Sequence, residues 1–186
     1  MLKLPFIKNQ HTLRTQTVLL RKVDIHTVDE ILQLQEKVVS SLTDSDLFVP
    51  FERKDLLALF ACEDNLLLGV FDEDGELIAF RAASVCGDDF DEVLPYLDEQ
   101  YHAVPKMLLA GAFVDPAYRS NRLQRKMIEY TLTWAYARGI KLFFTLIHPD
   151  NAASLKSVTS LGFEPYRHLI IYTHNHDRLL LVKMFP

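Results

Sequence analysis

Three arginines, Arg119, Arg122 and Arg125, stand where an apolar run gives way to a helical pattern, and their spacing points to anion chemistry. The run at 107–114 predicts a buried strand, and the residues after the arginines predict a helix over 121–138. A helix N-terminus presents backbone N–H groups that have no partner inside the helix, so it attracts an anion. The sequence therefore predicts a loop at residues 119–125 that holds a pyrophosphate.

The elements that follow complete a strand, helix, strand, helix order. The helix over 121–138 ends at Gly139, which is a favourable helix C-cap. The next run, 141–147, is apolar throughout, as a strand buried on both faces would be. A second helix is expected over 151–160, beginning at Asn151.

The remaining segments predict a sheet of mixed direction. Thr27 and Glu30 have the spacing of a capping box at the start of a helix. Asp74-Gly75 between two apolar runs predicts a hairpin. The other expected elements are strands at 17–24, 65–72, 76–86, 165–173 and 178–185, helices at 28–42 and 52–61, and an acidic insert at 87–106 that is helical over about 90–98. We therefore predict an α/β (α+β) fold with a mixed, mostly antiparallel sheet of about seven strands and about four helices.

Composition limits the class of protein. The chain has 186 residues, which fits one domain over 1–186, and a net charge of −5 that argues against general binding of nucleic acid. No apolar run is long enough to span a bilayer, and the first residues do not read as a signal peptide, so no membrane association is expected. Cys62 and Cys86 have no motif spacing, which favours two reduced thiols and a cytoplasmic protein.

Two motifs carry a resemblance to a known family. The segment Val114-Asp-Pro-Ala-Tyr-Arg119, and Asn151-x-x-Ser154 followed by Leu161-Gly162-Phe163, resemble the GNAT superfamily of N-acetyltransferases, and the element order also matches it. The resemblance implies a GNAT-like fold and acetyl-CoA as the co-substrate, with no metal. It also implies transfer of an acetyl group to an amine by direct attack in a ternary complex.

The resemblance also assigns residues to the co-substrate. In the family, one strand end pairs with the pantetheine arm, a loop of backbone N–H groups wraps the pyrophosphate, and an Asn begins the next helix beside it. The corresponding residues here are Ala112, Phe113 and Val114 for the strand end, Arg119, Ser120, Asn121, Arg122, Leu123, Gln124 and Arg125 for the loop, and Asn151 for the helix start. The chain departs from the family at Arg122 and Gln124, where the motif has Gly and then Gly or Ala.

The catalytic groups are less well marked. Many family members have a Glu five residues before the Asn and a Tyr seven residues after it, and these positions are Leu146 and Val158 here. His148 is the candidate general base, because it ends strand 141–147 and an imidazole titrates near neutral pH. The competing interpretation is that His148 caps the next helix or forms a local hydrogen bond.

Other residues leave alternatives open. Tyr118, Tyr166 and Tyr172 are candidates for the acid that protonates the thiolate, and each could equally be a packed aromatic. The carboxylates of the acidic insert could attract a cationic amine or could simply be solvated; they are Asp88, Asp89, Asp91, Glu92, Asp98 and Glu99. His174 and His176 have metal-like spacing without a third ligand, so a solvated turn is the simpler reading.

The function therefore has three candidate classes. The first is an N-acetyltransferase acting on a small amine, an amino-sugar or a peptide amine. The second is a GNAT-like module that binds CoA or acyl-CoA as a sensor or regulatory subunit without chemistry. The third is an α/β domain that binds another phosphorylated ligand. A homodimer through the last strands is also conceivable.

Overall fold

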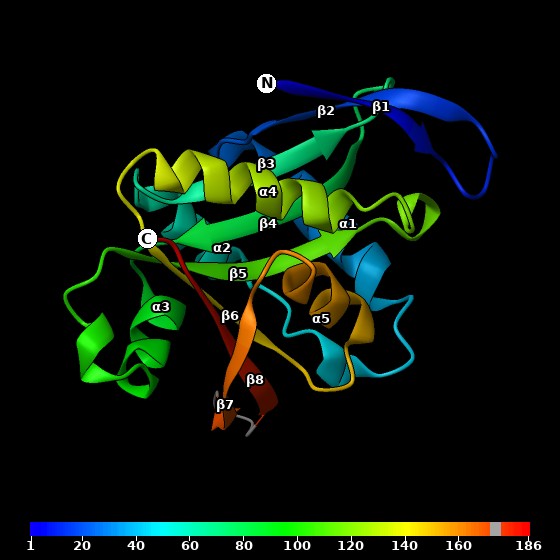
Figure 1. Cartoon of the computed structure of the whole chain (residues 1–186). Coiled ribbons are helices and arrows are strands. Elements are labelled where there is room, and N and C mark those ends of the chain that lie inside the picture. The colour runs from blue at the N-terminus through cyan, green and yellow to red at the C-terminus, as the bar shows by residue number, and fades with distance from the viewer. Residues whose placement is uncertain (172–175) are drawn as a thin grey trace.

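The protein is built on one mixed sheet flanked by helices, seen here in a computed structural model that describes residues 1–171 and 176–186 (Figure 1). Eight strands lie in the order β1-β2-β3-β4-β5-β6-β8-β7. They are β1 (Leu2–Lys8), β2 (Thr15–Lys22), β3 (Leu66–Phe71), β4 (Leu77–Ser84), β5 (Lys106–Val114), β6 (Leu142–Ile147), β7 (Glu164–Ile171) and β8 (His176–Met184). The α-helices are α1 (Val28–Val39), α2 (Arg53–Ala61), α3 (Asp88–Val93), α4 (Leu123–Tyr136) and α5 (Ala152–Thr159).

The strand directions confirm the predicted fold class. Every neighbouring pair is antiparallel except β5 and β6, which run parallel. The helix α4 connects this parallel pair, because a parallel connection has to cross over the sheet. The sheet is thus mixed and mostly antiparallel.

Helices cover both faces of the sheet (Figure 1). On one face α4 buries Leu123, Met127 and Ile128 against the strands, and all three are at most 2% exposed. On the other face α1 and α2 bury a second cluster that includes Ile31 and Leu56. A β-strand alternates its side chains between faces, so β4 and β5, whose described residues are mostly buried, supply both cores.

The N-terminal strand β1 corrects the predicted count of about seven strands. Residues 2–8 pair antiparallel with β2 and bury Leu4 and Ile7, although no strand was predicted there. The segment contains Pro5 and several polar residues, which hide the strand pattern in the sequence. Its position at the edge of the sheet tolerates a proline.

The predicted capping box at Thr27 and Glu30 is wrong. Thr27 makes no side-chain capping bond, and Asp24 instead accepts a hydrogen bond from the His26 N–H at the start of a short 3₁₀ turn. A capping box does form at α2, between Glu52 and Asp55.

Cys62 and Cys86 are joined in a disulfide, so the expectation of two reduced thiols is wrong. The physical reason lies in the β3–β4 hairpin. Cys62 lies just before β3 and Cys86 just after β4, and the antiparallel pairing of Leu66 with Ala83 brings these two ends of the hairpin together. The separation of 24 residues gave no sign of this in the sequence.

The acidic insert forms α3 at its start, over Asp88–Val93 rather than 90–98. Two 3₁₀ turns follow it, over Leu94–Tyr96 and Glu99–Tyr101. Phe90, Val93 and Leu97 pack with Phe144 of β6 and Leu180 of β8 in a third apolar cluster. The insert is therefore anchored against the sheet beside β5 and β6.

Candidate functional site

A cleft lies where the parallel strands β5 and β6 separate. The two strands pair only from Lys106 to Leu108, opposite Leu142 to Phe144. The Thr145 hydroxyl then donates to the Leu109 carbonyl at 2.9 Å, and beyond this bond the strands diverge. A cleft of about 160 Å³ occupies the space between them, lined by residues of both strands and of the segment before α2.

One wall of the cleft is a β-bulge in β5. Arg81 pairs with Ala112 and Ala83 pairs with Leu109, so Ala110 and Gly111 together face the single residue between. A Cβ atom at Gly111 would lie 2.3 and 2.4 Å from two ring atoms of Phe51, so only glycine fits there. A bulge disrupts the ladder locally, which leaves backbone polar groups for another strand-like partner.

The basic loop has the backbone shape that suits anion binding. Ser120 and Arg122 both have positive φ, 68° and 58°, and α4 begins directly after them at Leu123. The first helical hydrogen bond runs from the Lys126 N–H to the Arg122 carbonyl, which leaves the N–H groups of residues 123–125 without helical acceptors. Positive φ costs a residue with a side chain about 1–2 kcal/mol. Arg122 therefore carries a backbone strain that the glycine of the related motif avoids.

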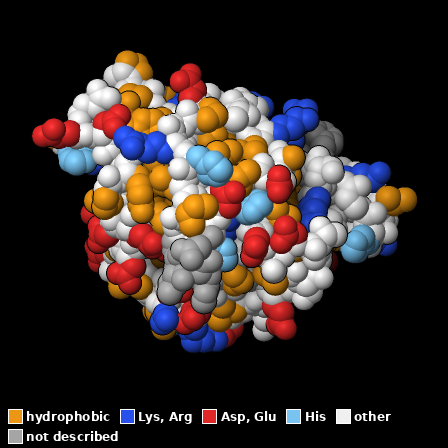
Figure 2. Space-filling model, turned by 90° about the horizontal axis from the view of Figure 1, so that it is seen from below, with side chains coloured by type: hydrophobic (Ala, Val, Ile, Leu, Met, Phe, Trp, Pro, Cys, Tyr) orange, Lys and Arg blue, Asp and Glu red, His pale blue; other side chains and the backbone are white. Residues whose placement is uncertain are grey.

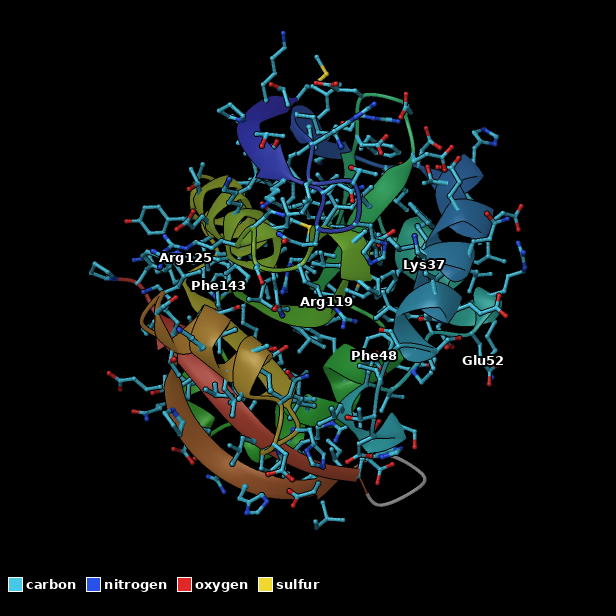
Figure 3. The ribbon with its side chains drawn as sticks, turned by 90° about the vertical axis from the view of Figure 1, so that its right-hand side faces the viewer. Lys37, Phe48, Glu52, Arg119, Arg125 and Phe143 are labelled. Atoms are coloured by element: carbon cyan, nitrogen blue, oxygen red, sulfur yellow. A yellow bond between two sulfur atoms is a disulfide. The ribbon has the colours of Figure 1, made fainter. Side chains whose placement is uncertain are left out.

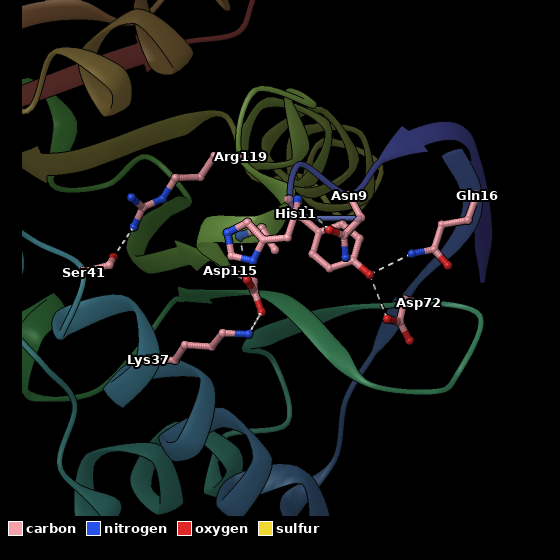
Figure 4. Close-up of polar contacts among 10 residues, drawn as sticks. Asn9, His11, Gln16, Lys37, Ser41, Asp72, Asp115 and Arg119 are labelled. Atoms are coloured by element: carbon pink, nitrogen blue, oxygen red, sulfur yellow. Dashed lines mark hydrogen bonds and ion pairs between the residues drawn. The ribbon is translucent and has the colours of Figure 1, made fainter. Parts of the chain in front are cut away.

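The three arginines of the loop have different surroundings; Figure 3 labels Arg119 and Arg125, and Figure 4 shows Arg119 reaching Ser41. Arg119 donates to the Ser41 hydroxyl at 2.6 Å, beyond the C-terminal end of α1. Arg125 pairs with Glu129 one turn along α4. Arg122 is exposed and has no hydrogen bond or ion pair with any described residue, so its guanidinium is available to a ligand.

Asn121 holds the loop in place. Its side-chain oxygen accepts from the Lys8 N–H at 2.9 Å, and its amide donates to the Lys8 carbonyl at 2.7 Å and to the Tyr118 carbonyl at 2.9 Å. The missed strand β1 is therefore a support for the basic loop. Near it, Lys37 of α1 pairs with the buried Asp115 at 2.5 Å (Figure 4).

Asn151 and Gln124 join the elements around the cleft. Asn151 caps α5 by accepting from the Ser154 N–H at 3.0 Å, and its amide donates to the Leu47 carbonyl at 3.3 Å. Gln124 donates to the Ser154 hydroxyl at 3.1 Å, which ties α4 to α5. Both residues line the cleft.

The end of β5, where the pantetheine strand was expected, contributes only part of its side chains to the cleft wall. Ala112 lines the cleft, together with the preceding residues from Leu108. Phe113 is 4% exposed and packs between Phe48 and Phe80, with ring centroids 5.6 and 5.3 Å away. Neither Phe113 nor Val114 is part of the cleft wall, so their side chains serve the core.

His148 lines the cleft at the end of β6 and forms the local bond that was its competing interpretation. The Asp150 N–H donates to its Nδ1 at 3.1 Å, so the neutral ring carries its proton on Nε2. Leu146 and Val158, where many relatives have Glu and Tyr, also line the cleft. Their apolar side chains cannot move a proton there.

Neither Tyr118 nor Tyr166 lines the cleft. Tyr118 is 5% exposed, donates to Asp72 at 2.9 Å and accepts from Gln16 at 2.7 Å, and burial raises the pKa of its hydroxyl. The Tyr166 hydroxyl accepts from the Asp98 N–H at 3.0 Å, away from the cleft wall. Tyr172 lies outside the described residues, as does His174 of the metal-like pair.

One acid of the insert reaches the cleft. Asp89 lines it beside Asp55 of α2, and the pKa of Asp89 is raised, first by desolvation and then by the Asp55 carboxylate. Asp98 instead pairs with Arg167 at the surface. Figure 2 shows carboxylates and histidines gathered with apolar side chains on the face below β7 and β8.

Two arginines in the cleft wall were missed by the sequence analysis. Arg81 of β4 and Arg178 of β8 are 3% and 4% exposed and both line the cleft. Arg178 donates to the backbone carbonyls of Asp177 and Asp46. A signal for Arg81 was present, because it is a single charged residue inside the apolar run 76–86 after Glu76.

Comparison with known families identifies the chain. Residues 36–163 match the model of the acetyltransferase (GNAT) family, which is more than half of the chain. The chain belongs to the acetyltransferase (GNAT) family. The predicted family membership is thereby confirmed.

Solved structures share this GNAT fold at low sequence identity. The ribosomal-protein-S18-alanine N-acetyltransferase from Escherichia coli is 15% identical, with a TM-score of 0.66 over 89% of this chain and 92% of its own. The PaiA N-acetyltransferase from Thermoplasma acidophilum, solved in complex with coenzyme A, is 15% identical, with a TM-score of 0.67 over 90% and 99%. The protein yncA from Salmonella typhimurium, solved with its cofactor acetyl-CoA, is 16% identical, with a TM-score of 0.62 over 90% and 93%. No curated protein sequence matches the chain.

Among residues 1–171 and 176–186, no group of three or more His, Cys, Asp or Glu side chains is arranged to hold a metal ion. Within the same residues, no helix combines the length and apolar character needed to cross a bilayer.

Proposed function

We propose that this chain is an acetyl-CoA-dependent N-acetyltransferase that moves an acetyl group to a primary amine of a small molecule, an amino-sugar or a peptide. The observation that carries the proposal is the cleft between β5 and β6, whose wall includes Gln124 of the first turn of α4 and Asn151 at the start of α5. This cleft places a strand bulge and a helix N-terminus along one path. A molecule with a pantetheine arm and a diphosphate matches both ends of that path.

The donor is held mainly by backbone groups. We propose that the N–H groups of residues 120–125 bind the diphosphate, with the Arg122 guanidinium as an added cation. The pantetheine arm pairs with the exposed backbone of β5 near Ala112. Asn151 contacts the same arm from the start of α5.

The chemistry is a direct transfer between two bound substrates. The acceptor ammonium loses a proton, and the neutral amine nitrogen attacks the thioester carbon. The C–N bond forms and the C–S bond breaks, and the sulfur leaves with a proton as the CoA thiol. A backbone N–H of β5 stabilises the developing oxyanion, and holding the two reactants together supplies much of the rate.

His148 is the proposed base, because it is a histidine that lines the cleft. Accepting a proton at Nε2 requires the ring proton to sit on Nδ1, so the bond from the Asp150 N–H has to open. His148→Ala should lower kcat/KM by about 10²-fold or more, the usual contribution of a general base. His168→Ala, at an exposed position on β7, is the matched control; an unchanged kcat/KM in His148→Ala removes the residue from the scheme.

The alternative is a non-catalytic sensor or regulatory module that binds CoA or acyl-CoA. The apolar Leu146 and Val158 in the cleft favour it, since neither can act as acid or base. Thermal unfolding with CoA and acetyl-CoA tests binding, because a ligand that binds the folded state raises Tm. Release of free thiol from acetyl-CoA with a panel of amines then separates the enzyme from the sensor; no rise in Tm would contradict both.

We also propose a single-domain protein that forms a homodimer through its last strands. The support for the dimer is that β7 is an edge strand and exposes Ile170, which is 59% accessible. Light scattering after size exclusion, with Ile170→Lys as the disrupting variant, measures it. A monomer in both proteins would contradict the dimer.

A further inference from the structure

The buried arginine of β4 has no counterpart among the described residues to neutralise its charge. The described residues include three buried charged side chains. Asp115 pairs with Lys37, and Arg178 donates to two carbonyls. Arg81 makes no hydrogen bond or ion pair with any described residue, and its Nε atom is buried without an acceptor.

The electrostatic surroundings of Arg81 agree with this. Desolvation by burial lowers the pKa of Arg81 to about 10, and no carboxylate offsets the shift. The guanidinium therefore stays charged at neutral pH. A buried charge without a partner is strongly unfavourable, so proteins keep one where a ligand supplies the opposite charge.

Its place in the fold points the guanidinium at the cleft. Arg81 lies between Ala79 and Ala83, which share the face of β4 that α4 covers. Its partner across the sheet is Ala112, next to the bulge of β5. Arg81 also lines the cleft together with Val158 of α5, so it borders the space proposed for the thioester.

We propose that Arg81 is the anchor of a carboxylate subsite, so that one of the two substrates of this enzyme carries a carboxylate close to the reacting carbon. A guanidinium binds a carboxylate through two parallel N–H donors, which would satisfy the orphaned Nε. The carboxylate belongs either to the acyl group of a dicarboxylic acyl-CoA, such as succinyl-CoA, or to an amino-carboxylate acceptor. The inference rests on the proposed function and deepens it.

The transfer itself is unchanged by this subsite. The amine nitrogen forms its bond to the thioester carbon, the C–S bond breaks, one proton leaves the nitrogen and the thiolate gains one. The carboxylate takes no part in the bonds that form or break. Arg81 therefore fixes the substrate rather than moving a proton.

The first arm of the test measures donor binding and needs no acceptor. Titration calorimetry compares succinyl-CoA with butyryl-CoA, whose acyl chain ends in a methyl group, on the unmodified protein, Arg81→Gln and the exposed control Arg53→Gln. The acyl-carboxylate source predicts that succinyl-CoA binds at least tenfold more tightly than butyryl-CoA. That preference disappears in Arg81→Gln and persists in Arg53→Gln.

The second arm measures the acceptor with acetyl-CoA as donor. Thiol release is followed with amino acids and with the amines that lack their carboxylate, in the same three proteins. The acceptor source predicts at least a tenfold lower KM for the amino acids, lost in Arg81→Gln. Arg81→Met, whose folding is checked by thermal unfolding, repeats both arms in case the Gln variant folds poorly.

The outcomes separate the failures. A preference for the carboxylate in either arm, lost with Arg81, supports the subsite and names its source. If neither arm shows a preference for the carboxylate, the proposed subsite is overturned. A uniform fall of kcat for all donors and acceptors in Arg81→Gln also overturns it, because that result would assign Arg81 to the reacting centre. If no CoA ester binds at all, the proposed function fails and this inference fails with it.

Discussion

Replacing the buried arginine of β4 with a neutral side chain should stabilise the free protein. Arg81 is 3% exposed and its guanidinium has no partner among the described residues. Arg81→Met keeps an unbranched side chain and removes the charge. Because the side chain borders the cleft, the atoms lost by shortening it open onto existing space and leave no closed void.

The magnitude follows from the pKa. Burial lowers the pKa of Arg81 to about 10, from an ordinary guanidinium value of roughly 12.5. Each pKa unit corresponds to about 1.4 kcal/mol, so charging Arg81 costs the folded state about 3 kcal/mol more than the unfolded state. This cost is fully present below the folded pKa, hence at pH 7, and shrinks as the pH rises above about 10.

Urea denaturation at pH 7 is the assay. The free energy of unfolding of Arg81→Met should exceed that of the unmodified protein by up to about 3 kcal/mol, or about 6–12 °C in Tm for a chain of this size. Arg53→Met, whose side chain is 55% exposed, should change stability by no more than about 0.5 kcal/mol. A loss of stability in Arg81→Met would refute the reasoning, because it would show that the free protein already compensates the charge.

Three more changes test the loop, the bulge and the cysteines. Arg122→Gly should raise the free energy of unfolding by about 1 kcal/mol, because glycine adopts positive φ without strain. The same change should weaken acetyl-CoA binding several-fold, because it removes a cation. Denaturation measures the first effect and calorimetry the second, and tighter binding would show instead that the Arg122 side chain obstructs the ligand. Gly111→Ala should lower the free energy of unfolding by about 1–3 kcal/mol and weaken acetyl-CoA binding, because the new Cβ would lie 2.3 Å from a ring atom of Phe51. Full stability together with normal binding would contradict the packing described. When the protein is purified without reductant and then unfolded, Cys62 and Cys86 should not react with a thiol reagent, because they form a disulfide. Reduction should lower the free energy of unfolding by up to about 3 kcal/mol, since the cysteines are 24 residues apart. Two reactive thiols before reduction would contradict the disulfide.

Much of the candidate site could be predicted from the sequence because it depends on local patterns. The apolar run of β5, the basic loop and the amphipathic stripe of α4 are contiguous in the chain, and each has its own periodicity or composition. The hairpin at Asp74-Gly75 was also predictable from the sequence, because Gly75 has a φ of 85° that glycine adopts freely. These features placed the basic loop and the start of α5 correctly in the element order.

Features that depend on contacts between distant segments could not be predicted in this way. The disulfide required the β3–β4 hairpin to bring Cys62 to Cys86, and β1 became a strand only because an edge of the sheet was open to it. The direction of each arginine in the loop was also decided by tertiary partners, such as Ser41 for Arg119.

The sequence by itself indicated the family, the order of the elements from β2 onward and the position of the basic loop. Only the tertiary structure decided that Arg81 lies buried against the cleft without a partner among the described residues, and that Leu146 and Val158 line the same cleft. The physical reason is that periodicity reports which face of an element is buried, whereas the charge balance of a cleft depends on side chains that folding gathers from strands and helices far apart in the chain.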